Sequence, residues 1–196
     1  MKKIFSIIAI AFLLSLGLGS CIKNDPVIFT GSQVEFDATS WNANSAGLTY
    51  PILGRNPGYG RVANTTDSTL RRYPQTVRIR INLIGAQLSK AETVGYEIFS
   101  SPITTFSMPA TIAGQTPSAA TGVLTVSNAV AGTHYAALSG TLNFPAASSF
   151  AFLDIQILNP GPTPGAGRFL GIKLNANGTI KAAVNYSELG LVIDQR

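Results

Sequence analysis

The stretch TVRIRINLIG, Thr76 to Gly85, decides the fold class of this 196-residue chain. Aliphatic residues occupy the odd positions from 77 to 83, and two arginines and an asparagine occupy the even positions between them. A period of two is typical of a strand that buries one face and exposes the other. We therefore predict a β-strand here, with its arginines on the exposed face.

The same period recurs along most of the chain. Segments with this pattern cover residues 93–99, 152–158 and 169–174, and shorter candidates cover residues 27–30, 33–37, 122–126, 140–144 and 189–194. Only residues 89–94 and 186–190 could hold even a helical turn, and Asn177-Gly178 suits a tight hairpin. About eight to ten short strands without a long helix predict an all-β, antiparallel sandwich of the Ig-like type.

The first residues have the pattern of a secretory signal peptide. Lys2 and Lys3 precede an apolar run that ends near Leu18, and the small residues Gly19 and Ser20 follow it. The run is too short to span a membrane comfortably. We expect residues 1–20 to be removed, which leaves one sandwich domain over residues 27–196.

The only cysteine, Cys21, follows this run directly in the sequence LGSC. That sequence resembles the lipobox of bacterial lipoproteins, and the resemblance implies a diacylglycerol on the Cys21 thiol after the signal peptide is cut away. Two or three acyl chains hold a protein on a membrane far more firmly than one. Residues 21–26 would then be the lipidated cysteine and a short tether. The alternative is an ordinary signal peptide with a chance cysteine.

The composition of the mature chain excludes several function classes. Of the 14 Lys and Arg, Lys2 and Lys3 leave with the signal peptide, so 12 face 9 acids and the net charge is +3. That is too mild to predict nucleic-acid binding. With Cys21 lipidated, no thiol remains for a disulfide, a zinc site or a nucleophile, and His134 is the only histidine. We expect no cofactor and no metal.

The segment AGTHYAALSGTLNFPAASSFAFLDIQIL, residues 131–158, resembles the signature of Calx-beta-type domains. The residues that match are Ala131, Gly132, Tyr135, Ser139, Gly140, Leu142, Phe144 and Pro145. His134 stands where that signature has an aspartate, so the calcium site of the family is not carried over, because calcium needs six to eight oxygen ligands. The resemblance implies a Calx-beta-like sandwich. Tyr135 follows the turn that holds His134, and we expect its ring to pack inward, as tyrosines do at the corners of sandwiches.

A wider resemblance covers most of the mature chain. The lipobox, the 76–85 strand, the GTHY turn and the segment GIKLNANGTIKAAVNYSE, residues 171–188, are similar to uncharacterised envelope lipoproteins of the Bacteroidetes type. Many such proteins are encoded beside outer-membrane systems that capture glycans. The resemblance implies a lipid anchor in the outer membrane, and it leaves open whether the domain faces the cell surface or the periplasm.

Charge is the most uneven feature of the mature chain. Six of the eight arginines lie between residues 55 and 80, namely Arg55, Arg61, Arg71, Arg72, Arg78 and Arg80. Residues 38–75 contain no clear strand, and a long loop in a compact domain is often functional. Arginine forks suit carboxylate or sulfate groups. A candidate ligand patch therefore comprises Arg72, Arg78, Arg80, Trp41 and Tyr59. The simpler interpretation, which we favour, is a solvated strand face beside a folded-down loop.

No catalytic constellation stands out, so we expect a protein that is not an enzyme. Glu35 and Asp37 share one strand face, and paired carboxylates are what glycoside hydrolysis requires. Neighbouring acids on a strand also arise as solvated charges that protect an edge. His134 has no nucleophile motif beside it. The triplet DST makes Ser68 a candidate O-glycosylation site of the kind found in such bacteria.

Two functions remain. The first is a lipid-anchored, non-enzymatic binding or accessory module of the cell envelope that takes part in glycan capture. The second is a structural or adhesive module that docks a protein partner of an outer-membrane complex through a sheet edge or face.

Overall fold

The computed structural model describes residues 29–38, 44–57, 69–108 and 122–196. The described residues form eleven strands and no helix, and no helix that could cross a membrane is found among them. The strands are β1 (Gln33–Phe36), β2 (Ile52–Leu53), β3 (Gln75–Ile84), β4 (Glu92–Phe99), β5 (Thr105–Met108), β6 (Gly122–Asn128), β7 (Thr141–Phe144), β8 (Phe150–Ile157), β9 (Ala166–Asn175), β10 (Lys181–Ala182) and β11 (Glu188–Asp194).

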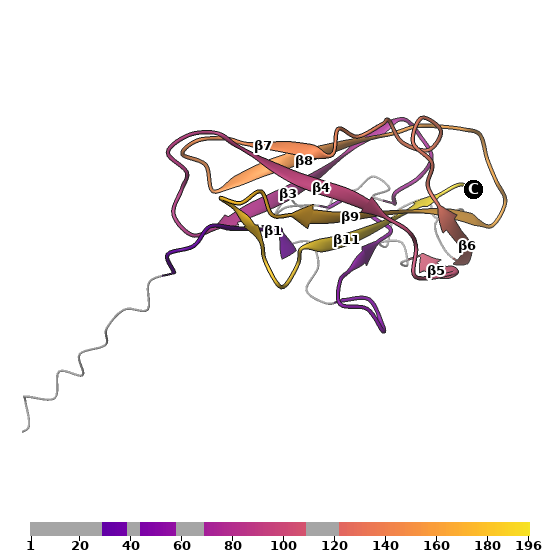
Figure 1. The fold of residues 1–196 in the computed structure, drawn as a ribbon. Coiled ribbons are helices and arrows are strands. Elements are labelled where there is room, and N and C mark those ends of the chain that lie inside the picture. Colours follow the sequence, from indigo (N-terminus) through magenta and orange to yellow (C-terminus); the bar gives the residue numbers. More distant parts are fainter. Residues whose placement is uncertain (1–28, 39–43, 58–68, 109–121) are drawn as a thin grey trace, which may run out of the picture.

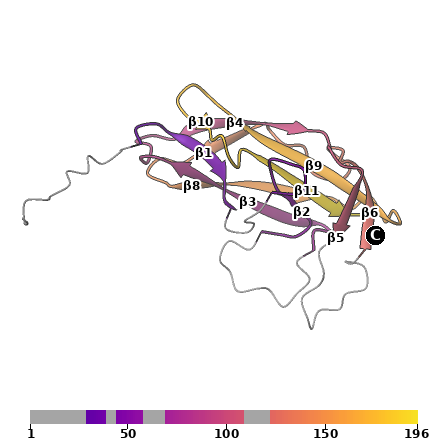
Figure 2. The same cartoon turned by 90° about the horizontal axis from the view of Figure 1, so that it is seen from below.

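The strands form two sheets packed face to face (Figures 1 and 2). One sheet has four strands in the order β10-β1-β3-β8. The other has seven strands, with the order β2-β11-β9-β4-β7 and with β6 and β5 added beside the first half of β9. The prediction of an all-β sandwich is confirmed. The sheets are mixed rather than purely antiparallel, because β1 with β10, β2 with β11 and β6 with β9 pair in parallel.

The main core lies between the two sheets. The odd positions of β3 and β8 point inward and are buried, as the period of two in the sequence predicts. They meet the buried even positions of β9, such as Leu170 and Ile172, and the odd positions of β11. Burial of these aliphatic side chains supplies most of the stabilisation of the fold, at about 25 cal/mol per Å² of apolar surface.

A second apolar cluster lies on the outer face of the seven-stranded sheet. Phe169 and Val192 point outward from β9 and β11, and Leu124 and Val126 of β6 join them. Tyr50 and Ile52, which come from the segment before and within β2, cover this side, and the Tyr50 ring meets Phe99 edge-on at a centroid distance of 5.3 Å. One outer face of the sandwich is therefore covered by its own chain.

This covering segment corrects the prediction for residues 38–75. The segment is not one long loop, because β2 pairs with β11, the last strand in the sequence. Thr69 forms a further bridge to Arg55, and Arg71 forms one to Asp194. The two segments that could hold a helical turn contribute to strands instead, since residues 92–94 belong to β4 and residues 188–190 belong to β11. Residues 29–30 are not in a strand, and residues 27–28 lie outside the described part.

The Asn177-Gly178 turn has a different role from the predicted hairpin. The Asn177 side-chain oxygen accepts hydrogen bonds from the backbone N–H groups of Thr179 and Ile180, and Gly178 adopts a φ of 91°. The chain then enters β10, which pairs with β1 in the opposite sheet. The turn therefore carries the chain from one sheet to the other, so its sequence predicts the bend and not the partner of the next strand.

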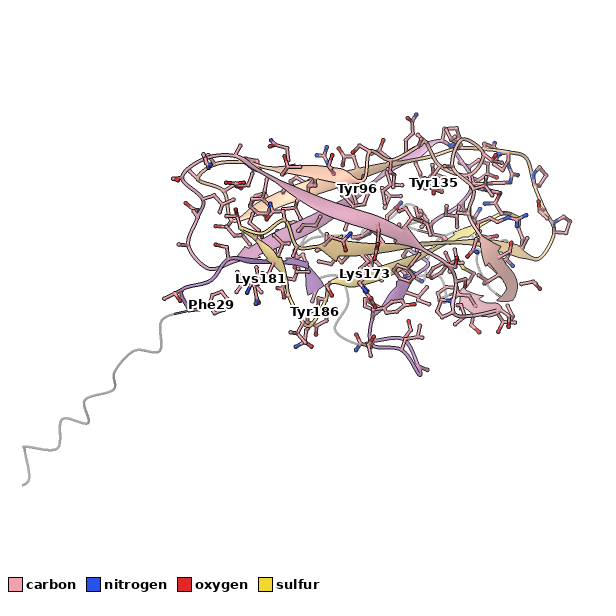
Figure 3. The ribbon with its side chains drawn as sticks, viewed as in Figure 1. Phe29, Tyr96, Tyr135, Lys173, Lys181 and Tyr186 are labelled. Carbon is pink, nitrogen blue, oxygen red and sulfur yellow. The ribbon has the colours of Figure 1, made fainter. Side chains whose placement is uncertain are left out.

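The two ends of the sandwich differ. Phe29 and Lys181 lie at one end (Figure 3), and the C-terminus lies at the other end together with β5 and β6 (Figures 1 and 2). We call these the entry end and the distal end, because the described chain enters the sandwich at Phe29.

Candidate functional site

The outer face of the four-stranded sheet carries the candidate site. We call it the open face, because nearly all of its residues are exposed or half-buried and no described strand lies over it. Strand register and alternation place the following residues on it: Gln33, Glu35, Asp37, Thr76, Arg78, Arg80, Asn82, Phe150, Phe152, Asp154, Gln156 and Lys181. The period of two in β1, β3 and β8 therefore places two aromatic rings and several charged groups on one surface.

Two exposed phenylalanines form the apolar part of the open face. Phe150 and Phe152 are 43% and 39% exposed, although both belong to a strand of the sheet. Their rings meet edge to face, with a centroid distance of 5.5 Å and an interplanar angle of 66°. Leaving two such rings in water forgoes the free energy that their burial would supply, so this pair is the least expected feature of the surface.

Arg78 is held by Asp154 on the neighbouring strand. Its Nε and Nη2 donate to the two carboxylate oxygens of Asp154, both at 2.7 Å, in a fork-to-fork pair. This hydrogen bonding raises the pKa of Arg78 and lowers the pKa of Asp154 below its ordinary value. The guanidinium lies over the Phe152 ring, 5.1 Å from the centroid. Arg78 is thus fixed in place while more than half of its side chain stays exposed.

Arg80 is also held by an acidic side chain, which comes from the β1 side of β3 rather than from β8. It forms an ion pair with Asp37, whose side chain is almost fully buried, and its guanidinium lies 5.7 Å from the centre of the Phe150 ring. Glu35 lies on the same face, as the sequence predicts. Burial raises the pKa of Glu35 and the charge of Asp37 adds to the rise, while a hydrogen bond from Asn82 opposes it.

The structure divides the predicted patch of arginines and aromatics. Arg78 and Arg80 share the open face, but Arg72 precedes β3 at the distal end, where its Nη1 donates to the Asn159 side-chain oxygen at 2.9 Å. Trp41 and Tyr59 lie outside the described residues. Arg78 and Arg80 are each ion-paired with an acidic side chain on this face. Cys21 and Ser68 also lie outside the described part of the chain.

Sequence reasoning missed Phe150 and Phe152. A signal for them was present, because Ala151, Leu153 and Ile155 alternate with them and had to point inward. Phe150 and Phe152 occupy the alternate positions of the strand, as Asp154 does, so they must face outward.

His134 lies buried in a tight turn. It is 6% exposed, and its Nδ1 accepts a hydrogen bond from the Val130 backbone N–H at 2.9 Å. Burial lowers the pKa of His134, and the charge of Arg168 lowers it further. Tyr135 beside it is buried in the main core, as the sequence predicts (Figure 3). Within the described residues no group of His, Cys, Asp and Glu could hold a metal ion.

Comparisons with known proteins give structural neighbours only. No family model matches the chain, and no curated protein does either. Among solved structures, the apo form of the Calx CBD1 domain is 15% identical with a TM-score of 0.42, and the match covers 84% of this chain and 98% of that one. The CBD12 structure of CALX1.2 is 17% identical with a TM-score of 0.39; the match covers 65% of this chain and 39% of the other.

A third neighbour is a proposed carbohydrate-binding protein from Bacteroides ovatus. It is 8% identical with a TM-score of 0.38, and the match covers 62% of this chain and 32% of that one. At such identities and TM-scores, no ligand or partner is carried from these proteins to this chain. The fold assignment stands on the two sheets themselves, which make the protein an all-β sandwich.

Proposed function

We propose that the protein is a non-enzymatic, lipid-anchored binding module of the bacterial cell envelope, and that it captures glycans on the open face. The observation that carries this proposal is the exposed Phe150–Phe152 pair with Arg78 and Asp154 fixed beside it. Aromatic rings offer apolar surface to the C–H faces of sugar rings. Fixed charged and amide groups next to them can hydrogen-bond sugar hydroxyls without losing much side-chain entropy on binding.

The surroundings of the acids on the open face support binding rather than hydrolysis. Hydrolysis of a glycosidic bond requires two available carboxyl groups, one of them with a raised pKa. Asp37 is buried in its ion pair with Arg80, and Asp154 is paired with Arg78, which lowers its pKa. Glu35 has a raised pKa, but the described acids beside it on this face are both held by arginines.

The anchor is proposed from the sequence alone. Residues 22–28 separate Cys21 from Phe29, which is the first described residue and lies at the entry end. A chain segment spans at most about 3.3–3.6 Å per residue, so such a short tether has a limited reach. With acyl groups on Cys21, the entry end would therefore stay close to the membrane.

The anchor and the membrane face can be tested together. Mass spectrometry of the N-terminal peptide from membranes should find acyl groups on Cys21, and the Cys21→Ser variant should appear in the soluble fraction. Protease treatment of intact cells should remove the domain if it faces outward and spare it until lysis if it faces the periplasm. A wild-type protein without acyl groups would remove the anchor from the proposal.

Glycan binding is tested with the double variant Phe150→Ala/Phe152→Ala on a glycan array. The matched control is Val123→Ala/Val130→Ala, which also removes two exposed apolar side chains, 63% and 54% exposed, away from the open face. We expect roughly tenfold weaker binding for the first pair, equivalent to about 1.4 kcal/mol, and no loss of binding for the control. Equal binding by both variants, with unchanged melting temperatures, would exclude the open face.

A protein partner is the second candidate, and the edge of β8 favours it. Beyond β8 only the short segment around Tyr135 bridges to the described sheet, at Ile157, and the Ala136 N–H donates to the Gln156 carbonyl at 2.9 Å. No described strand is paired with this edge between Phe150 and Asp154. An open edge can accept a strand from another chain. Affinity capture from membranes that yields a stoichiometric protein and no glycan would favour this candidate.

A further inference from the structure

The fold separates the arginine-rich part of the sequence into two groups. Arg78 and Arg80 lie on the open face with their acidic partners. The other described arginines of this part of the sequence lie at the distal end, together with two arginines from the last third of the chain. We call this group the distal arginine cluster; its members are Arg55, Arg71, Arg72, Arg168 and Arg196.

Backbone pairing around the end of β11 brings the cluster together. Arg71 forms a parallel bridge with Asp194, and the Arg72 N–H donates to the Asp194 carbonyl at 2.9 Å. The Arg72 Nε donates to the carbonyl of Arg196 at 3.3 Å. Arg168 lies on β9 opposite Ile193, one residue from Asp194 in the register. Arg55 is bridged to Thr69, two residues before Arg71.

The cluster has a large excess of positive charge. Of the described side chains at this junction, Asp194 is the only acidic one, and its fully buried carboxylate pairs with Arg196 at 2.8 Å. The main-chain carboxylate of Arg196, which accepts from Arg72, adds a second negative charge. All five arginines are half-buried. Their charges therefore lie partly in the low-dielectric protein rather than in water, which strengthens their attraction for an approaching anion.

The chemistry around Arg72 fits a sugar that carries an acid group. Tyr73 is 48% exposed, and the Arg72 guanidinium lies 4.9 Å from its ring centroid. The Asn159 side chain accepts from Arg72 Nη1 and adds an amide to the same spot. The planar guanidinium matches carboxylate and sulfate groups, and the exposed aromatic ring beside it offers a stacking surface.

This spot is also in line with the open face. Asn159 follows β8, which carries Phe150 and Phe152, and a strand rises about 3.3 Å per residue, so Phe152 and Asn159 are at most about 23 Å apart along the chain. A polymer bound at the phenylalanine pair could therefore reach the distal arginine cluster, whereas a single sugar could not.

We propose that the captured glycan is a polyanion with carboxylate or sulfate groups, and that the distal arginine cluster binds those groups. This inference rests on the proposed function for the identity of the ligand as a glycan. Two residues carry it: Arg72, whose Nη1 donates to the Asn159 side-chain oxygen, and Arg168, whose Nη1 donates to the Ser127 hydroxyl on β6.

The test compares two charge-matched double variants. Arg72→Gln/Arg168→Gln removes two positive charges from the distal end, and Lys90→Gln/Lys173→Gln removes two positive charges from exposed side chains elsewhere. Each protein is titrated with heparin as the sulfated probe, polygalacturonate as the carboxylated probe, neutral dextran and double-stranded DNA, at increasing salt concentration. Thermal melting of each variant confirms that it is folded.

We expect the wild type to bind heparin or polygalacturonate with an affinity that falls as salt rises, because salt screens exposed charge pairs. The arginine variant should bind these probes at least about tenfold more weakly and with a shallower salt dependence, and the lysine variant should bind like the wild type. An Arg72→Lys variant should lie in between, since it keeps the charge and loses the fork.

Three results would overturn the inference: no binding of either anionic polysaccharide by the wild type, equal loss in both double variants, or binding of DNA alone. If the arginine variant changes nothing while Phe150→Ala/Phe152→Ala abolishes binding of a neutral glycan, the inference fails and the proposed function stands. If anionic polysaccharides bind through the arginines and the phenylalanine variant has no effect on any glycan, the open face is the part that fails.

Discussion

At the scale of single residues, His134 is the clearest case of a side chain whose neutral form the folded state favours. Its Nδ1 accepts a backbone hydrogen bond from Val130, so protonation of this nitrogen would break that bond. Burial and the nearby Arg168 both lower its pKa from the ordinary value of 6.5. The neutral ring is therefore part of the folded state.

This environment predicts a loss of stability in mild acid. The unfolded chain binds a proton at His134 near pH 6.5, whereas the folded chain binds it only at lower pH, so the free energy of unfolding falls as pH drops below about 6.5. Urea unfolding of wild type and His134→Gln between neutral pH and about pH 5 checks this, because the sequence has no other histidine. A variant that keeps the full pH dependence of the wild type would contradict it.

Glu35 has the opposite effect on how the free energy of unfolding changes with pH. The contribution of His134 is therefore read from the difference between the wild type and the variant. Because its pKa is raised in the folded state, protonation of Glu35 at lower pH favours folding. The difference between wild type and His134→Gln isolates the histidine, since Glu35 is common to both.

The sequence alone predicted which side most of these residues face, but not what they touch. The alternation in 76–85 placed Arg78 and Arg80 outward, and they are outward. Their partners, Asp154 and Asp37, lie far from them in the sequence or on another strand, so no local pattern indicated that their charges were compensated. Pairing across strands depends on register, which the sequence does not state.

At the scale of elements, glycines in β9 and β11 make room for the rings on the outer face of the seven-stranded sheet. A Cβ on Gly171 would lie 2.6–2.7 Å from atoms of the Phe99 ring, and one on Gly190 would lie 2.7 Å from the Phe169 ring. The rings therefore lie directly on the backbone, and the second apolar cluster depends on these glycines.

We predict that Gly171→Ala destabilises the protein by about 1–3 kcal/mol, because overpacking forces the Phe99 ring from its place. The matched control is Gly95→Ala in β4, where a Cβ would make only an ordinary contact, 3.7 Å from Asn175. Chemical denaturation measures both variants. A Phe99→Ala background should reduce the effect of Gly171→Ala, and an unchanged effect there would argue against the ring contact.

Periodicity predicted the long strands β3, β4, β8 and β9 because each has enough residues to show a period of two. β2 and β10 have only two residues each, so they carry no period, and their existence depends on distant partners in β11 and β1. The second apolar cluster was hidden for the same reason, since its members come from separate segments of the chain.

At the scale of the whole molecule, the last strand is central to the sandwich. β11 lies between β2 and β9, and its inward residues Leu189, Leu191 and Ile193 are fully buried. Removing it would uncover the main core along its length, leave β2 without a partner strand and leave one edge of β9 unpaired.

We predict that a chain ending at Ser187 does not fold. It should show no cooperative thermal transition and should be digested rapidly by protease, because the buried face of β9 would be open to water. The control is a chain that begins at Phe29 and keeps β11, which should melt like the mature protein. Cooperative melting of the chain that ends at Ser187 would show that β11 is dispensable.

The parallel pairings have a further consequence for the time at which the protein can fold. The pairing of β1 with β10 and that of β2 with β11 each join a strand made early to a strand made near the end of synthesis. Contacts of such long sequence separation form slowly. A growing chain therefore cannot complete the sandwich until almost all of it has been made. If residues 1–20 act as the proposed signal peptide, this delay would keep the chain in an unfolded form during export.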